Sequence, residues 1–203
     1  MCYVIRLLTV TFFLDNGGIY LDTDIIVLRS FDPLRRFATT LGRETSYGLG
    51  SGIILAEPNS VFIHLWLNSF KSYNPWPWNW AKYAVWTPHV LARQFAEEIH
   101  IEETRLQHPT WAQSDQLCEK LYDWSENYAV HVWKRFCEVP QTVEEINSLN
   151  NTLGEVFRYV YYGSKKLRQT SESSKPKSHL KRSMSNYVDV MGHKFLEYIN
   201  FNN

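Results

Sequence analysis

The most constraining feature of the sequence is the segment 17–28, in which two aspartates interrupt an otherwise apolar and β-branched run. A run of this kind predicts a β-strand that is buried on both faces. An unpaired carboxylate is costly to bury, and two neighbouring carboxylates also repel each other. We therefore expect a positively charged partner beside Asp22 and Asp24.

The spacing of the two aspartates indicates what that partner is. Residues i and i+2 of a strand project to the same side, so Asp22 and Asp24 would present two hard oxygen ligands suited to Mg²⁺ or Mn²⁺. The alternative is a strand followed by a turn, in which each aspartate accepts hydrogen bonds from backbone amides. A bare Asp-x-Asp motif occurs more often in that second setting. Here the apolar run resumes directly after Asp24, which strengthens the metal-binding interpretation.

Composition narrows the class of protein. The 203 residues are 44% hydrophobic and carry no net charge, which predicts one globular domain and gives no reason to expect nucleic acid as a partner. No apolar run is long enough to cross a bilayer. The cysteines lack metal-site spacing; Cys118 and Cys137 could form a disulfide in an oxidising compartment or remain buried thiols.

Strand and helix patterns alternate along the chain, which predicts an α/β fold. Glycines at 48, 50 and 52 lead into a short buried strand at 53–56, and we expect helices to begin at Ser60 or Asn59 and at Thr87. The apolar residues at 91, 95 and 99 extend the second helical pattern, and another helix is plausible at 115–122. The tryptophan-rich segment 73–80 predicts a loop that either stacks on sugar or packs on the core.

The domain organisation follows from composition. We assign residues 1–162 to the folded domain, 163–183 to a basic, serine-rich disordered linker and 184–203 to a short C-terminal helix.

The octet Gly-Gly-Ile-Tyr-Leu-Asp-Thr-Asp at 17–24 closely resembles the signature of the DXD-containing glycosyltransferases of the sugar-binding-region type (family 32). This family includes α-1,4-galactosyltransferases and fungal mannosyltransferases. Weaker similarity continues in the family's order at 30–34, 50–58 and 127–133, and the resemblance covers roughly residues 15–136.

The resemblance implies a fold and an activity. The fold would be a partial GT-A (Rossmann-like) domain, with a mixed sheet flanked by helices. The activity would be the metal-dependent, retaining transfer of a hexose from UDP-hexose or GDP-mannose to a glycan or glycolipid acceptor. The location would be the lumenal side of the Golgi membrane.

The resemblance also implies roles for individual residues. Asp22 and Asp24 would be the catalytic pair: Asp24 would bind the metal directly, and Asp22 would act through water or the ribose hydroxyls. His131 is placed like a later metal ligand, and an imidazole favours Mn²⁺ over Mg²⁺. The donor- or acceptor-binding residues would be Tyr20, Gly50, Ser51, Gly52, Trp78 and Trp133. No general base is evident, and a retaining transfer needs none because the departing phosphate oxygen can take the acceptor proton.

Two other functions are compatible with parts of the sequence. Haloacid-dehalogenase-like phosphatases also carry Asp-x-Asp after a buried strand, with the first aspartate as nucleophile. The chain could also be a catalytically inactive fragment or a glycan-binding protein. It departs from the family at Ser51, where many members carry asparagine.

The position of the aspartate pair predicts a truncated family member. Only 21 residues precede Asp22, fewer than one βαβ unit of about 30 residues. We therefore expect an N-terminally truncated member that lacks the Golgi anchor, with an exposed apolar edge at the aspartate-bearing strand.

Overall fold

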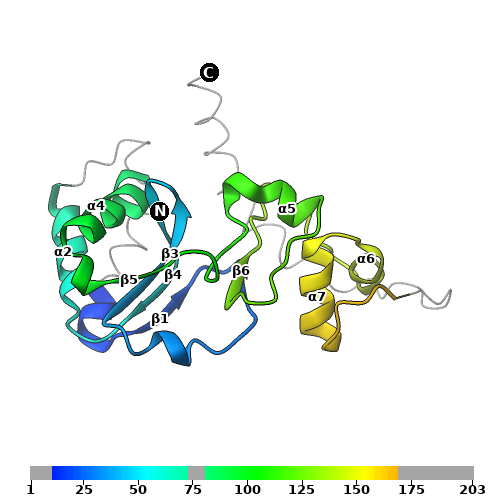
Figure 1. Ribbon diagram of the computed structural model, residues 1–203, viewed down its shortest axis with the longest axis horizontal. Helices are drawn as coiled ribbons and strands as arrows, with labels where there is room; N and C mark the ends of the chain where they lie inside the picture. Colours follow the sequence, from blue (N-terminus) through cyan, green and yellow to red (C-terminus); the bar gives the residue numbers. More distant parts are fainter. Residues whose placement is uncertain (1–10, 73–80, 169–203) are drawn as a thin grey trace, which may run out of the picture.

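The computed structural model describes residues 11–72 and 81–168, which form an α/β fold with a mixed sheet and flanking helices (Figure 1). The strands are β1 (Gly18–Leu21), β2 (Ile25–Val27), β3 (Thr39–Thr45), β4 (Gly48–Ala56), β5 (His100–Glu102) and β6 (Ala129–His131). The α-helices are α2 (Val61–Ser69), α4 (Thr87–Gln94), α5 (Ser114–Cys118), α6 (Val143–Ser148) and α7 (Thr152–Tyr162). Residues 11–16 are also helical. The expected α/β class is confirmed.

The strands form two sheets. The larger sheet has the order β1-β4-β3-β5, in which β3 and β5 are parallel and the other neighbours antiparallel. Its central strand β4 is buried along its whole length. The smaller sheet pairs β2 with β6 antiparallel. In Figure 1, α2 and α4 lie on one side of the molecule and α5, α6 and α7 on the other, with β6 between them.

The prediction of one strand buried on both faces at 17–28 is wrong. The chain turns between Asp22 and Ile25, and the backbone nitrogen of Ile25 donates to the Asp22 carbonyl oxygen at 3.2 Å. As a result, β1 and β2 belong to different sheets. Within the described residues β1 lies at one end of the larger sheet, and the side chains of Ile19 and Leu21 are 45% and 37% exposed. The expected truncation and its exposed edge stay a prediction. The continuous apolar run thus contains two strands that belong to different sheets.

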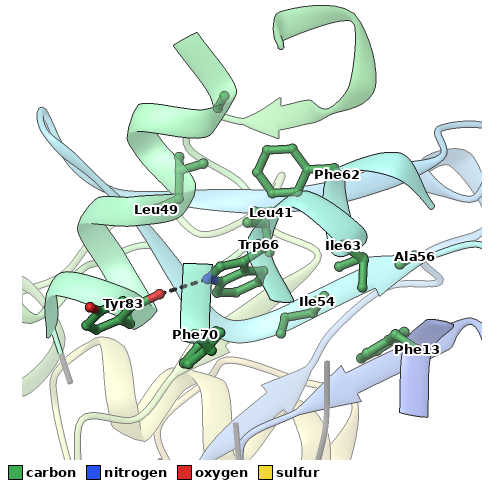
Figure 2. Packing of buried hydrophobic residues seen from close by; sticks show 11 residues of the cluster. Phe13, Leu41, Leu49, Ile54, Ala56, Phe62, Ile63, Trp66, Phe70 and Tyr83 are labelled. Carbon is green, nitrogen blue, oxygen red and sulfur yellow. Dashed lines mark hydrogen bonds between the residues drawn. The ribbon is translucent and has the colours of Figure 1, made fainter. Parts of the chain in front are cut away.

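The main core lies between the larger sheet and α2. Ser60 caps α2 by accepting a hydrogen bond from the Ile63 nitrogen, as one of the two expected caps. The helix then buries Phe62, Ile63 and Trp66 against β3 and β4 (Figure 2). The indole Nε1 of Trp66 donates to the Tyr83 carbonyl oxygen at 2.7 Å. This bond satisfies a polar group that would otherwise be buried without a partner.

The second helix differs from its prediction at both ends. A π-helical turn at Lys82–Trp86 runs directly into α4, so Thr87 is a helical residue rather than the N-cap. The helix ends at Gln94, and Ile99 lies beyond it, just before β5. The four-residue apolar spacing continues past the helix because this segment also packs on the core. The helix expected at 115–122 is the shorter α5.

Beside the smaller sheet, Cys118 and Cys137 form a disulfide with a Cα–Cα distance of 5.3 Å. It joins the end of α5 to the segment that follows β6, next to a buried cluster containing Leu117, Val130 and Val156. Of the two alternatives for these cysteines, the structure has the disulfide.

Helix α7 ends at Tyr162, where Gly163 adopts a left-handed conformation with φ of 69°. The assigned linker beyond residue 168, the helix at 184–203 and Trp78 lie outside the described residues. Within the described segments, no helix has the length and apolar character needed to cross a bilayer.

Candidate metal centre

The candidate centre consists of Asp22, Asp24 and His131, whose potential ligand atoms all lie within 4.8 Å of one another. Asp22 follows β1, Asp24 precedes β2, and His131 is the last residue of β6. Pairing of Ile25 with His131 brings the imidazole beside Asp24, and the Val132 nitrogen donates to the Asp24 carbonyl at 2.9 Å. The strand pairing of the smaller sheet therefore joins residues 107 positions apart.

The electrostatics favour an anionic Asp24. Its Oδ1 lies 3.1 Å from the His131 Nε2. Burial raises the pKa of Asp24, but the hydrogen bond and charge of His131, with a smaller contribution from Lys134, leave that pKa below its ordinary value. His131 is buried, and its Nδ1 has no hydrogen-bond partner among the described residues. Two carboxylates and an imidazole are a donor set that fits Mn²⁺ or Mg²⁺.

Asp22 is held by two hydrogen bonds that differ in kind. The Tyr20 hydroxyl donates to Asp22 Oδ1 at 2.5 Å, and the Asp22 backbone nitrogen donates to the Gly52 carbonyl at 2.8 Å. Tyr20 thus contacts a candidate ligand directly, and its expected role in donor binding stays a prediction.

Replacing Tyr20 with phenylalanine should weaken metal binding by about tenfold. A hydrogen bond to a charged group contributes about 1.5 kcal/mol, which is the free-energy equivalent of that change. Calorimetric titration with Mn²⁺ measures it. Tyr47→Phe is the matched control, because Tyr47 is 58% exposed and lies outside the cluster. Equal affinities for the two variants would contradict a role for the Tyr20 hydroxyl.

The glycines of β4 make room for side chains around the centre. A Cβ on Gly52 would lie 3.2 Å from His131 Nδ1 and 3.3 Å from Asp22 Oδ2. A Cβ on Gly50 would overlap the amide of Gln107. Ser51, between them, is buried. The space at Gly50 is therefore filled by the protein, and the ligand-binding roles expected for these three residues stay predictions.

Trp133 lies against the imidazole of His131. The two rings stack with centroids 3.6 Å apart and planes 20° from parallel. The indole Nε1 donates to the Pro109 carbonyl at 2.8 Å, and the backbone φ of Trp133 is 49°. This packing fixes the orientation of His131, so Trp133 supports the centre from one side.

Sequence reasoning missed a buried polar pair beside the centre. Gln107 Nε2 donates to Glu44 Oε2 at 2.6 Å, and both residues are buried. Burial, with a smaller contribution from the charge of Asp22, raises the pKa of Glu44 to about 8, although the Trp111 backbone amide opposes the shift. The two residues are 63 positions apart, and no spacing in the sequence signals their contact.

The described residues thus define an α/β protein with a candidate centre for a divalent cation, set between two sheets. The chain is 34% identical to glucan organizing enzyme 1 of Cryptococcus neoformans var. grubii serotype A over 147 residues, which cover 64% of this chain and 39% of that protein. It is 29% identical to lactosylceramide 4-alpha-galactosyltransferase of Mus musculus over 141 residues, which cover 59% of this chain and 37% of that protein. It is also 29% identical to the Homo sapiens protein of that name over 141 residues, which cover 59% of this chain and 38% of that protein.

No family model matches the chain, and no solved structure matches it. The chain spans about two fifths of the length of these curated relatives. The two lactosylceramide relatives are named as galactosyltransferases, which are glycosyltransferases, and this is the class whose signature the octet at 17–24 resembles.

Proposed function

We propose that this chain carries the metal and diphosphate site of a glycosyltransferase that moves a hexose from a nucleotide sugar to a glycan or glycolipid acceptor. The observation that carries the proposal is the convergence of Asp22, Asp24 and His131 within 4.8 Å, in a chain similar to a relative named as a galactosyltransferase. The larger sheet would be part of a GT-A domain of the DXD-containing family 32.

The residues of the centre have distinct tasks in this proposal. Asp24 and His131 bind the cation directly, and Asp22 completes the site either directly or through water. Tyr20 fixes the Asp22 carboxylate through its hydroxyl, and Trp133 fixes the His131 ring by stacking. When bound, Mn²⁺ or Mg²⁺ supplies the positive charge and Lewis acidity that neutralise the departing diphosphate.

The donor and acceptor classes follow from the resemblance and from the relatives' names. We propose UDP-hexose or GDP-mannose as donor, with retention at the transferred carbon. One relative is named for lactosylceramide and another for glucan, so the proposed acceptor is a glycolipid or a glycan. The proposed location is the lumenal side of the Golgi membrane, and the disulfide between Cys118 and Cys137 suits an oxidising lumen.

The phosphatase alternative fits the centre less well. It needs the first aspartate as a nucleophile and an acidic pair from a later loop to hold Mg²⁺. Here Asp22 Oδ1 accepts a hydrogen bond from Tyr20, and the later residue of the cluster is His131 rather than an acid. This donor set favours a cation-binding role for both aspartates.

The proposal predicts metal-dependent stabilisation by nucleotide sugars. A ligand that binds the folded chain raises its melting temperature. We expect UDP-hexoses or GDP-mannose to do so with Mn²⁺ present and to lose the effect in EDTA, as measured by a thermal-shift series on the 203-residue chain. Nucleotide binding that is unchanged in EDTA contradicts the metal site. Turnover of p-nitrophenyl phosphate instead of a sugar nucleotide would support the phosphatase, and binding without turnover the inactive or glycan-binding alternative.

A further inference from the structure

The buried pair of Glu44 and Gln107 forms a wall beside the metal centre. Glu44 lies where β3 shifts register against β4, between the partners Arg43 and Thr45. Gln107 fills the space in front of Gly50, and its Cγ would lie 3.2 Å from a Cβ on Gly42. β3 and β4 therefore each contain a glycine, Gly42 and Gly50, at the point where the side chain of Gln107 packs against the sheet.

The hydrogen bonds of this pair are incomplete for an ionised carboxylate. Glu44 is only 5% exposed, and among the described residues no lysine, arginine or histidine forms an ion pair with it. Its Oε2 accepts from Gln107, whereas Oε1 of Glu44 and Oε1 of Gln107 are buried without hydrogen-bond partners. Apart from the Trp111 backbone amide, which favours the ionised form of Glu44, no other donor is recorded for these two buried oxygens among the described residues. A proton on the carboxyl group would therefore supply a donor that the pair otherwise lacks.

We infer that Glu44 is held as a neutral carboxylic acid by Gln107, and that the pair is an uncharged wall that positions the Gly50–Gly52 part of β4 behind Asp22. In this sense Glu44 is a positioning residue. The consequence for the centre rests on the proposed function. With Glu44 neutral, the charge to be balanced by one divalent cation is that of Asp22 and Asp24 alone.

The connection from the pair to the centre is short. Gly50 lies two residues before Gly52, whose carbonyl accepts from the Asp22 nitrogen and whose Cα faces the side chains of Asp22 and His131. Asp22 is also the one titratable side chain whose charge acts on Glu44, and the Trp111 amide is the one backbone donor nearby, within the described residues. Ionisation of Glu44 would place a third negative charge beside the pair of aspartates.

The state of Glu44 has a signature in stability. Its pKa rises from 4.5 to about 8 on folding, so the folded chain keeps a proton that the unfolded chain releases. The free energy of unfolding therefore falls as pH rises from 4.5 to 8 and then levels off. Glu44→Gln keeps a neutral side chain of the same shape and removes this loss.

The test compares Glu44→Gln with wild type by melting temperature between pH 5 and pH 9, using the full chain. We expect the variant to gain about 5 °C or more relative to wild type across this range, because only wild type loses stability over the roughly three pH units between pH 5 and the pKa of Glu44 at about 8. Each kcal/mol of that loss lowers the melting temperature of a chain of this size by about 2–4 °C. Glu57→Gln is the matched control, since Glu57 follows β4 and is exposed. Parallel curves for wild type and Glu44→Gln would overturn the inference.

Two further measurements keep the inference testable. Infrared difference spectra of wild type should show the C=O stretch of a protonated carboxylic acid at pH 7, and this band should disappear near pH 9. Absence of the band at pH 7 overturns the inference even if Glu44→Gln does not fold.

The Mg²⁺ affinity of wild type should rise at least about twofold between pH 7.5 and pH 9.5, as the new charge appears near Asp22, and the affinity of Glu44→Gln should stay constant. Equal pH profiles would contradict the link to the centre. Failure of both proteins to bind Mg²⁺ would instead refute the proposed function, while melting and infrared data still decide the state of Glu44.

Discussion

Replacing Asp24 with asparagine should abolish metal-dependent nucleotide binding, with a loss of at least about a hundredfold in Mn²⁺ affinity. Asparagine keeps the shape of the side chain but removes the charge that pairs with His131 and would bind the cation. A hundredfold loss of affinity corresponds to about 3 kcal/mol of binding free energy. Calorimetric titration with Mn²⁺, with and without nucleotide sugar, measures it.

Asp32→Asn is the matched control for this experiment. Asp32 is an exposed aspartate at the start of a short 3-10 helix, where it pairs with Arg35, and it lies outside the cluster. The control should bind Mn²⁺ like wild type. Asp22→Asn should weaken binding less than Asp24→Asn, because Asp22 is expected to act at least partly through water. Undiminished Mn²⁺ affinity in Asp24→Asn would refute the assignment of the centre.

Replacing His131 with alanine should raise the Mn²⁺ concentration needed for half-maximal nucleotide binding by roughly tenfold. The change removes the third potential ligand and also the ring that Trp133 stacks on. Loss of one ligand or of its supporting contact typically reduces metal affinity 10–100-fold.

Two readouts together separate ligation from packing at this position. His131 is buried, so His131→Ala should also lower the melting temperature. If the histidine only packs in the core, stability falls while the Mn²⁺ titration stays as in wild type. His64→Ala is the control, since His64 is exposed on α2 and should leave both measurements unchanged.

The sequence predicted the convergence of Asp22 and Asp24 but for an incomplete reason. The two-residue spacing suggested one strand with both side chains on the same side. In the structure the chain turns between them, and β2 joins a second sheet through β6. Apolar residues flank the turn on both sides because each short strand needs them, so the pattern could not reveal where one strand ends and the next begins.

Other parts of the centre depend on contacts that no local pattern encodes. His131 could be proposed only from the resemblance at 127–133, because its approach to Asp24 results from the pairing of β2 with β6. Glu44 and Gln107 left no signal, since their contact depends on the register shift of β3 and on the space at Gly50. By contrast, Ser60 was one of two caps expected for α2, because a cap is determined by residues within one turn.

The division of the centre between two sheets has a mechanical consequence. Asp22 extends from the end of β1 in the larger sheet, whereas Asp24 and His131 belong to the β2–β6 ribbon. A cation bound to all three side chains would act as a crosslink between the larger sheet and the β2–β6 ribbon. Part of its binding free energy would therefore stabilise the packing of the ribbon against the sheet. Reducing the Cys118–Cys137 bridge, which anchors the segment after the ribbon, should then loosen cation binding although neither cysteine is among the candidate ligands.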